Sequence, residues 1–299
     1  MLALVGPTAT GKSALAVAVA QALGASGRPA EIVNGDSMLV YRGMDIGTAK
    51  PTPAERGGVP HHLIDTMDVT QTASVAQFRD EARAAIADCR ARGVVPILVG
   101  GSALYTHAIL DRLDLPPTDA GVRARWEAEL ARLGPAALHD ELARRHPAAA
   151  AAILPGNGRR IVRALEAIEL TGDFRAHLPE PVYELDRVTQ IGLSIDRETL
   201  DRRIARRVDA MWAAGFVDEV RALEASGLRR GLTASRALCY RQVLAYLDGA
   251  MTEAEARAAT VTATRRFARK QEGWLKRDAR IVWHRFDEPG LVDRIVEQT

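Results

Sequence analysis

The first thirteen residues join a short apolar stretch to a phosphate-binding loop motif. Residues 1–5 are apolar, and the next eight read Gly-Pro-Thr-Ala-Thr-Gly-Lys-Ser. They fit the pattern G-x-x-x-x-G-K-[ST] without a mismatch, and an alanine- and valine-rich helical run follows over 14–23. A strand, a glycine-rich turn and a helix in this order direct backbone N–H groups and the helix N-terminus at one anion. The sequence therefore predicts an α/β fold that holds a di- or triphosphate after its first strand.

The motif assigns a role to each part of the loop. Lys12 adds a full positive charge, and the hydroxyl of Ser13 is a ligand for a Mg²⁺ ion. The residues predicted to bind the di- or triphosphate are Gly6, Pro7, Thr8, Ala9, Thr10, Gly11, Lys12 and Ser13.

Composition limits the class of protein. The chain has 299 residues, of which 47% are hydrophobic and 26% charged, which is ordinary for a water-soluble globular protein. No apolar run approaches the roughly 18–20 residues of a membrane span, and the first residues do not resemble a signal peptide. Cys89 and Cys239 lie far apart and form no metal-binding spacing, so we expect a cytoplasmic, reduced protein. The formal net charge is only +2, so the chain as a whole gives no sign of a positive electrostatic field that would attract nucleic acid. Local clusters of positive charge therefore matter more.

The remainder of the chain alternates between strand and helix signals. Strands are predicted at 1–5, 31–35, 62–65, 94–99, 188–195 and 280–284, with helices at 74–92, 159–171, 200–226 and 252–277. This order indicates a P-loop NTPase-like fold, with a mostly parallel sheet, helices on both faces and ligands at the carboxyl ends of the strands. One segment, 115–154, has no strand signal and is predicted to be a small all-helical insertion with helices at 122–132 and 135–145. The core domain is then 1–114 and 155–299.

Two predicted strand ends carry polar or small residues. Asp36 follows the second strand, next to the phosphate loop, where its carboxylate could hold Mg²⁺, orient a nucleophile, accept a proton or merely cap a turn. The fourth strand ends in Gly100, Gly101 and Ser102, where P-loop ATPases commonly have an Asp. This difference argues against an ATP-hydrolysing motor and suggests that a ligand approaches the backbone closely.

Three basic clusters favour a polyanionic partner. They are Arg159, Arg160 and Arg163; Arg202, Arg203, Arg206 and Arg207; and seven cations between Arg265 and Arg280. In the third, Phe267, Gln271, Trp274 and Leu275 have helical spacing and predict an apolar seam beside the basic face. His61 and His62 are adjacent and point to opposite sides of a strand, so we expect a structural role rather than a metal site.

These residues together resemble the tRNA dimethylallyltransferases, which prenylate adenosine 37 beside the anticodon. The similarity runs in order along nearly the whole chain. It includes residues 6–13, 36–51, 59–65, 100–105, 160–172, 215–223, 240–242 and 264–270. It implies that the loop holds dimethylallyl diphosphate rather than ATP, with Mg²⁺ bound through Ser13 as cofactor. It also implies that Lys12, Arg207 and Thr8 stabilise the leaving diphosphate, while Asp36 accepts the proton of the adenine N6 amine.

The resemblance also implies which residues contact tRNA. They are Asp36, Ser37, Met38, Leu39, Ser102, Arg123, Arg159, Arg160, Ile161, Val162, Arg163, Tyr240, Arg241 and Gln242, with Cys239 preceding the last three. The partners expected are the tRNA anticodon stem-loop and dimethylallyl diphosphate, with no membrane, and we expect a monomer.

The chain departs from the pattern of this family at several positions. Ser102 replaces a commoner Thr, Leu39 a Gln, and Cys239 a Gly, while Gly158 and Arg159 replace a usual Pro-Gln pair. The segment 175–186 is short. Three alternatives stay open: prenyl transfer to a free adenine nucleotide, a small-molecule P-loop kinase, and a non-catalytic RNA-binding module.

Overall fold

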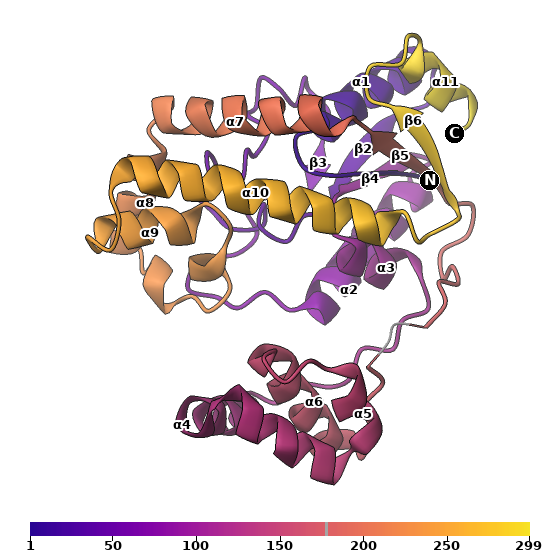
Figure 1. The fold of residues 1–299 in the computed structure, drawn as a ribbon. Coiled ribbons are helices and arrows are strands. Elements are labelled where there is room, and N and C mark those ends of the chain that lie inside the picture. The colour runs from indigo at the N-terminus through magenta and orange to yellow at the C-terminus, as the bar shows by residue number, and fades with distance from the viewer. Residues whose placement is uncertain (177–178) are drawn as a thin grey trace. The chain divides into compact units, whose positions relative to one another are not determined.

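The computed structural model describes residues 1–176 and 179–299 and divides the chain into two compact units (Figure 1). The core unit comprises Met1–Asp111 and Tyr183–Thr299, and the helical unit comprises Arg112–Val182. The segment 175–186, predicted to be short, includes the two residues outside the described ranges.

A six-stranded parallel sheet forms the centre of the core unit, in the order β3-β2-β4-β1-β5-β6. The strands are β1 (Leu2–Val5), β2 (Ala30–Asn34), β3 (His61–His62), β4 (Val95–Gly100), β5 (Thr189–Ser194) and β6 (Ile281–Arg285). All six predicted strands are confirmed, and so is the predicted fold class. The third strand is shorter than predicted, because Leu63 and Asp65 have φ values of 60° and 58° that turn the chain away from the sheet.

Helices cover both faces of the sheet because successive side chains of each strand point to opposite sides. Leu2 and Leu4 of β1 are fully buried in a cluster with α1 (Lys12–Ala25) and α11 (Leu291–Glu297). Ala3 points the other way, into a cluster with α2 (Val75–Ala91) and α3 (Ala103–Leu110). β1 lies between β4 and β5, so the loop that follows it opens at the centre of the sheet's carboxyl edge.

The C-terminal helices of the core unit are α7 (Arg197–Ala213), α8 (Phe216–Ala225), α9 (Tyr240–Leu247) and α10 (Glu253–Leu275), with short 3₁₀ turns at Leu228–Arg230 and Ala234–Arg236. The single helix predicted over 200–226 is wrong. Gly215 has a φ of 89°, which ends α7 and begins α8. Helices α7 and α10 lie side by side (Figure 1).

The predicted apolar seam of α10 is only half correct. Gln271 and Leu275 are buried, but Phe267 is 40% exposed and Trp274 is 39% exposed. The buried row of the helix is instead Ala256, Thr260, Thr264, Ala268, Gln271 and Leu275. Most of these side chains are small, so hydrophobicity alone does not mark the face that packs closely against α7 and α9.

The helical unit has its own core. It contains α4 (Ala120–Arg145, kinked at Gly134), α5 (Pro147–Ala152) and α6 (Gly158–Thr171). The two helices predicted at 122–132 and 135–145 are the two halves of α4. The predicted domain boundary at 154 differs from the structure, which continues this unit to Val182. The reason is that α6 buries Ile161 and Leu165 against Trp126 and Leu142 of α4. No helix in the described part of the chain has the length and hydropathy needed to cross a membrane.

Candidate active site

The loop after β1 has the shape of a phosphate cradle. Gly6 has a φ of 147° and comes so close to β5 that a Cβ would lie 3.0 Å from the carbonyl oxygen of Leu193. Gly11 adopts the left-handed conformation, with φ of 99°, and directs the chain into α1. Only glycine adopts these conformations without strain, so both positions of the motif are explained by backbone geometry.

One cavity of about 620 Å³ lies at the carboxyl edge of the sheet, within the core unit. The four residues predicted to be catalytic, Thr8, Lys12, Asp36 and Arg207, all line it, although they come from three separate parts of the chain. Further lining residues include Ala9, Gly11, Ser13, Leu39, Thr48, Gly101, Arg203, Arg206, Phe267 and Gln271. The structure therefore brings the predicted phosphate loop, carboxylate and arginine into a single site.

The cationic side of the cavity holds positive charges close together. Lys12 Nζ donates a hydrogen bond to the carbonyl oxygen of Pro7 at 2.6 Å. Burial, followed by the nearby Arg207 guanidinium, lowers the pKa of Lys12 from 10.5 to about 7, while Asp36 acts in the opposite direction. Arg207 donates to Thr8 Oγ1 at 3.3 Å and to the carbonyl oxygen of Thr48 at 3.1 Å. Clustered buried cations are costly without a counter-charge, so this pocket is built for an anion.

The position of Asp36 depends on a close approach of two strand ends. Gly35 follows β2 and Gly100 ends β4, and a Cβ on Gly100 would lie 2.9 Å from the carbonyl oxygen of Gly35. Asn34 Nδ2 donates to the carbonyl oxygens of Asp36 and Leu63, which holds the turn in place. Asp36 Oδ1 accepts a hydrogen bond from the Met38 backbone N–H at 2.9 Å. Asp36 thus both shapes this turn and presents a carboxylate to the cavity.

Two further side chains, which the sequence analysis did not assign to the site, hold the phosphate loop through hydrogen bonds to its backbone. Arg203 Nε on α7 donates to the carbonyl oxygen of Ala9 at 2.7 Å. Gln271 Oε1 on α10 accepts a hydrogen bond from the Thr8 backbone N–H at 2.8 Å. Arg203 belongs to the same basic cluster as Arg207, and this cluster was the signal that could have assigned it to the site. Gln271 had been placed in an apolar seam, and only the packing of α10 beside the loop shows its role.

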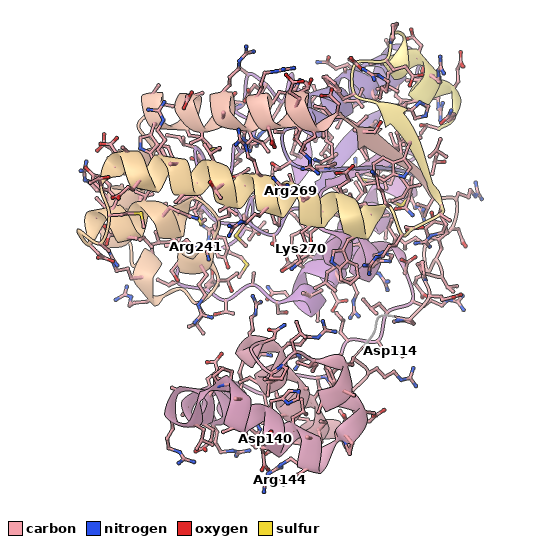
Figure 2. All side chains as sticks on the ribbon, in the orientation of Figure 1. Asp114, Asp140, Arg144, Arg241, Arg269 and Lys270 are labelled. Carbon is pink, nitrogen blue, oxygen red and sulfur yellow. The ribbon has the colours of Figure 1, made fainter. Side chains whose placement is uncertain are left out.

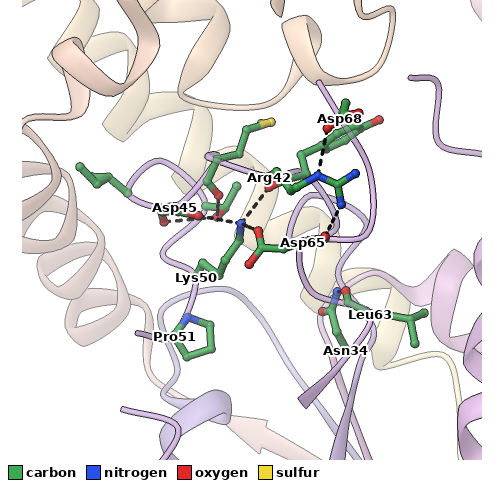
Figure 3. Close-up of polar contacts among 12 residues, drawn as sticks. Asn34, Arg42, Asp45, Lys50, Pro51, Leu63, Asp65 and Asp68 are labelled. Atoms are coloured by element: carbon green, nitrogen blue, oxygen red, sulfur yellow. Dashed lines mark hydrogen bonds and ion pairs between the residues drawn. The ribbon is translucent and has the colours of Figure 1, made fainter. Parts of the chain in front are cut away.

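The loop between Asp36 and Pro51 is fixed by ionic contacts (Figure 3). Lys50 is buried, and its Nζ contacts Asp45 Oδ1 at 2.7 Å, Asp65 Oδ1, and the carbonyl oxygen of Tyr41 at 2.8 Å. Arg42 pairs with Asp68 nearby. Because a buried ammonium is stable only with such partners, Lys50 serves to fold the loop.

Glu219 of α8 and Tyr240 of α9 hold the other side of this loop. Glu219 accepts hydrogen bonds from the backbone N–H groups of residues 45–47, at 2.6–3.3 Å, and from the Tyr240 hydroxyl at 2.6 Å. The Tyr240 side chain is fully buried. The structure gives this side chain a packing role inside the core unit, and the expected contact of residue 240 with tRNA stays a prediction. Gln242 is also buried, whereas Arg241 projects outward from α9 (Figure 2).

Substitution of Gly47 tests the packing of this loop. A Cβ on Gly47 would lie 2.3 Å from Phe216 Cε2 and 2.6 Å from Tyr240 Cε2. We expect Gly47→Ala to destabilise the protein by about 1–3 kcal/mol, because two buried aromatic rings must shift. Urea unfolding measures this change. Gly24→Ala, in α1 with no atom within 4 Å of its Cβ, is the matched control and should be neutral or slightly stabilising. Equal stability of the two variants would contradict the packing argument.

Cys239, one of the departures from the family pattern, lies in a strained conformation. Its φ is 76° and its ψ is −50°, just before α9, which explains why glycine suits this position. We expect Cys239→Gly to be about 1 kcal/mol more stable than Cys239→Ala, the reverse of the usual order, because only glycine relieves the strain. Chemical unfolding of the two variants side by side measures the difference. A more stable alanine variant would mean that the conformation costs nothing.

The structure separates the predicted tRNA-contacting residues of the helical unit into two groups. The side chains of Ile161 and Val162 are buried in its core, and their expected contact with tRNA stays a prediction. Arg123 and Arg163 both bind the buried carboxylate of Glu166, with N–O distances of 2.8 Å, and each remains partly exposed. Arg159 and Arg160 are exposed. In the core unit, Ser102 precedes α3, and Ser37, Met38 and Leu39 continue the turn after Asp36.

The His62 side chain contacts more residues in the structure than the sequence indicates. Its Nε2 lies 2.7 Å from Glu31 Oε2 and 3.7 Å from Cys89 Sγ, so three possible metal ligands lie together. Arg92 occupies both oxygens of Glu31, at 2.8 Å each, and this contact lowers the pKa of Glu31 to about 2. The arginine already balances the carboxylate charge, which agrees with the structural role expected for His62.

The phosphate loop after β1, the parallel sheet and the cavity at its carboxyl edge define a P-loop NTPase-like α/β protein. Comparison with known sequences places it more closely. A family model described as IPP transferase matches residues 39–278. A tRNA dimethylallyltransferase of Thermobifida fusca is 62% identical over 98% of this chain and 92% of its own length. One of Kineococcus radiotolerans is 63% identical over 95% of this chain and 90% of its own length. The chain belongs to the IPP transferase family and is a transferase enzyme.

Solved structures agree with this placement. A tRNA isopentenylpyrophosphate transferase from Bacillus halodurans has 40% sequence identity and a TM-score of 0.72, covering 99% of this chain and 94% of the other. A eukaryotic dimethylallyltransferase acting on tRNA has 23% identity and a TM-score of 0.78, covering 100% of this chain and 76% of the other. The second likeness supports the fold alone.

Proposed function

We propose that this protein transfers a dimethylallyl group from dimethylallyl diphosphate to N6 of adenosine 37 of tRNA and releases diphosphate. The observation that carries the proposal is that a phosphate cradle with two cations and the carboxylate of Asp36 line one and the same cavity. In the reaction a bond forms between N6 and the allylic carbon, and the bond between that carbon and the diphosphate oxygen breaks. The electron pair leaves with the diphosphate, and one N6 proton passes to Asp36.

The cationic residues bind the diphosphate and stabilise it as it leaves. Lys12 and Arg207 place positive charge where negative charge develops, and Thr8 provides a hydroxyl beside Arg207. Arg203 and Gln271, which line the same cavity, keep the loop in shape through their hydrogen bonds. Because N6 is a weak nucleophile, much of the rate would come from holding the two reactants in the correct orientation.

The oxygen donors of the site fit a magnesium ion. Ser13 exposes its hydroxyl in the first turn of α1, and the Asp36 carboxylate lines the same cavity. Hydroxyl and carboxylate oxygens are the ligands that Mg²⁺ prefers, and Ser13 would hold the ion. When bound, Mg²⁺ would supply further positive charge against the diphosphate.

Each unit contributes basic side chains suited to a polyanion such as the anticodon stem-loop. In the core unit, Arg269 and Lys270 project from α10 and Arg241 from α9 (Figure 2). In the helical unit, α6 exposes Arg159 and Arg160. The target base would be turned out of the RNA stack to enter the cavity, as in other enzymes that modify bases. The monomeric state and the cytoplasmic location stay predictions.

Mass spectrometry of nucleosides tests the proposed function. The protein is incubated with Mg²⁺, dimethylallyl diphosphate and unmodified tRNA, and AMP and ATP are tested in parallel. We expect the mass of a prenyl group on adenosine from tRNA only, at position 37 after mapping of RNase fragments. Prenylated AMP would instead assign the protein to transfer onto free nucleotides. Formation of ADP without prenylation would indicate a kinase.

A further inference from the structure

Two neighbouring chain segments join the helical unit to the core unit. The chain leaves the core unit after Asp111 and returns at Tyr183, and these two residues form an isolated antiparallel bridge. On either side, the Glu184 N–H donates to the carbonyl oxygen of Leu110 and the Arg112 N–H to that of Val182, both at 2.8 Å. So short a pairing is marginal in water, and side-chain contacts must hold it closed.

Arg280, between α10 and β6, contacts both segments. Its Nη1 and Nη2 atoms donate to the two carboxylate oxygens of Asp111, at 2.6 and 3.0 Å. Its guanidinium also lies over the Tyr183 ring, with Cζ 4.0 Å from the ring centroid. Asp278 fixes the same guanidinium through Nε at 2.8 Å and Nη2 at 2.7 Å. A two-pronged ion pair and a stacked ring together require the planar group of arginine, which lysine lacks.

The groups around Arg280 are buried and held from several elements. Asp111 and Asp278 are 3% and 5% exposed. His107 Nδ1 of α3 lies 2.7 Å from Asp111 Oδ2, and Gln190 Nε2 of β5 donates to the Tyr183 hydroxyl at 2.8 Å. None of these residues lines the cavity described above. Removing one charge from such a buried network leaves the others without compensation, so loss of Arg280 should open the pairing.

We propose that Arg280 is a positioning residue for the transfer reaction, because it clasps the two segments from which the helical unit extends. If the helical unit were loosely attached, RNA binding would have to order the attachment, and the entropy lost would weaken the affinity for RNA. The contacts of Arg280 with Asp111 and Tyr183, here called the clasp, order the attachment beforehand. They therefore favour RNA binding and leave the binding of the small diphosphate substrate unaffected. This inference rests on the proposed function, since it assumes that the helical unit binds RNA.

The test compares Arg280→Gln with Arg92→Gln. Arg92 makes an equally two-pronged pair, with Glu31, in the same unit, and its other side-chain partners are Asp88 and Cys89 rather than residues of the two segments. Hydrogen exchange is followed at residues 108–113 and 182–186, and affinities are measured for an anticodon stem-loop RNA and for inorganic diphosphate. In Arg280→Gln we expect at least about tenfold faster exchange of the Arg112 and Glu184 amides and about tenfold weaker RNA binding. Diphosphate affinity should stay within about twofold, and Arg92→Gln should leave all three readouts near wild type.

Tyr183→Leu is the second variant, used if Arg280→Gln does not fold. It removes the ring beneath the guanidinium and keeps the ion pairs, so the same amides should exchange faster by a smaller factor. Exchange no faster than in Arg92→Gln would overturn the clasp. Faster exchange with unchanged RNA affinity would overturn the positioning role. If the wild-type protein binds diphosphate but no RNA, the proposed function fails and the positioning role with it, while exchange still reports on the clasp.

Discussion

Replacing Asp36 with asparagine is expected to lower turnover by about 100-fold or more while leaving tRNA affinity within a few-fold. The amide cannot accept a proton from the N6 amine during attack. Asparagine does keep an oxygen that can accept the hydrogen bond from the Met38 N–H, so the turn after β2 should survive. Single-turnover prenylation at saturating dimethylallyl diphosphate, together with RNA binding by filter retention, measures the two effects separately.

The alanine variant serves as the comparison for the turn. Asp36→Ala loses both the proton acceptor and the hydrogen bond from the Met38 N–H. Any loss of turnover beyond that of Asp36→Asn therefore measures how much the turn contributes to turnover. Turnover in Asp36→Asn at the wild-type rate would rule out the carboxylate as the base. The remaining role would then be that of a turn residue, which the sequence had left open.

Lys12→Met is expected to reduce kcat/KM for dimethylallyl diphosphate by about 10³-fold, through weaker binding and slower turnover together. Methionine keeps most of the apolar stem but removes the charge that faces the leaving diphosphate. The effect should be large because Lys12 lines the cavity and is desolvated enough for its pKa to be lowered, so its charge is less screened than one on the surface. Steady-state kinetics and calorimetric titration with inorganic diphosphate measure both components.

Lys270→Met provides the matched control, because it removes the same charge from the surface of α10. This variant should bind diphosphate normally but bind tRNA more weakly and with a shallower salt dependence, since one phosphate contact is lost. Wild-type diphosphate affinity in Lys12→Met would contradict the assignment of the cradle.

The strand pattern and the phosphate loop could be predicted because both depend on local signals. The apolar stretches before Gly6 and Gly100 are strands in the structure, and the motif between Gly6 and Ser13 forms its loop as predicted. Asp36 could be placed near that loop from the rule that parallel strands end at one edge.

Other details depended on segments that come together only on folding. No local signal shows that Glu219 and Gly47 enclose the Tyr240 side chain. The helix 158–171 was expected in the core domain, but Trp126 of α4 provides the apolar surface that it covers. Gln271 was predicted to lie in an apolar seam, but α10 passes beside the phosphate loop and Gln271 accepts a hydrogen bond from the Thr8 N–H.

The sequence by itself determined the phosphate loop with its lysine, the six parallel strands and the position of Asp36 near that loop. These features follow from backbone conformation, side-chain alternation and charge within short stretches of chain. Only the tertiary structure decided that Arg203 and Gln271 support the loop, that Tyr240 is buried, and that Arg280 holds the two segments joining the units. Each of these depends on which surfaces meet after folding. Contacts such as Gln271 with Thr8 and Arg280 with Asp111 join residues more than a hundred positions apart, so they leave no local pattern to detect.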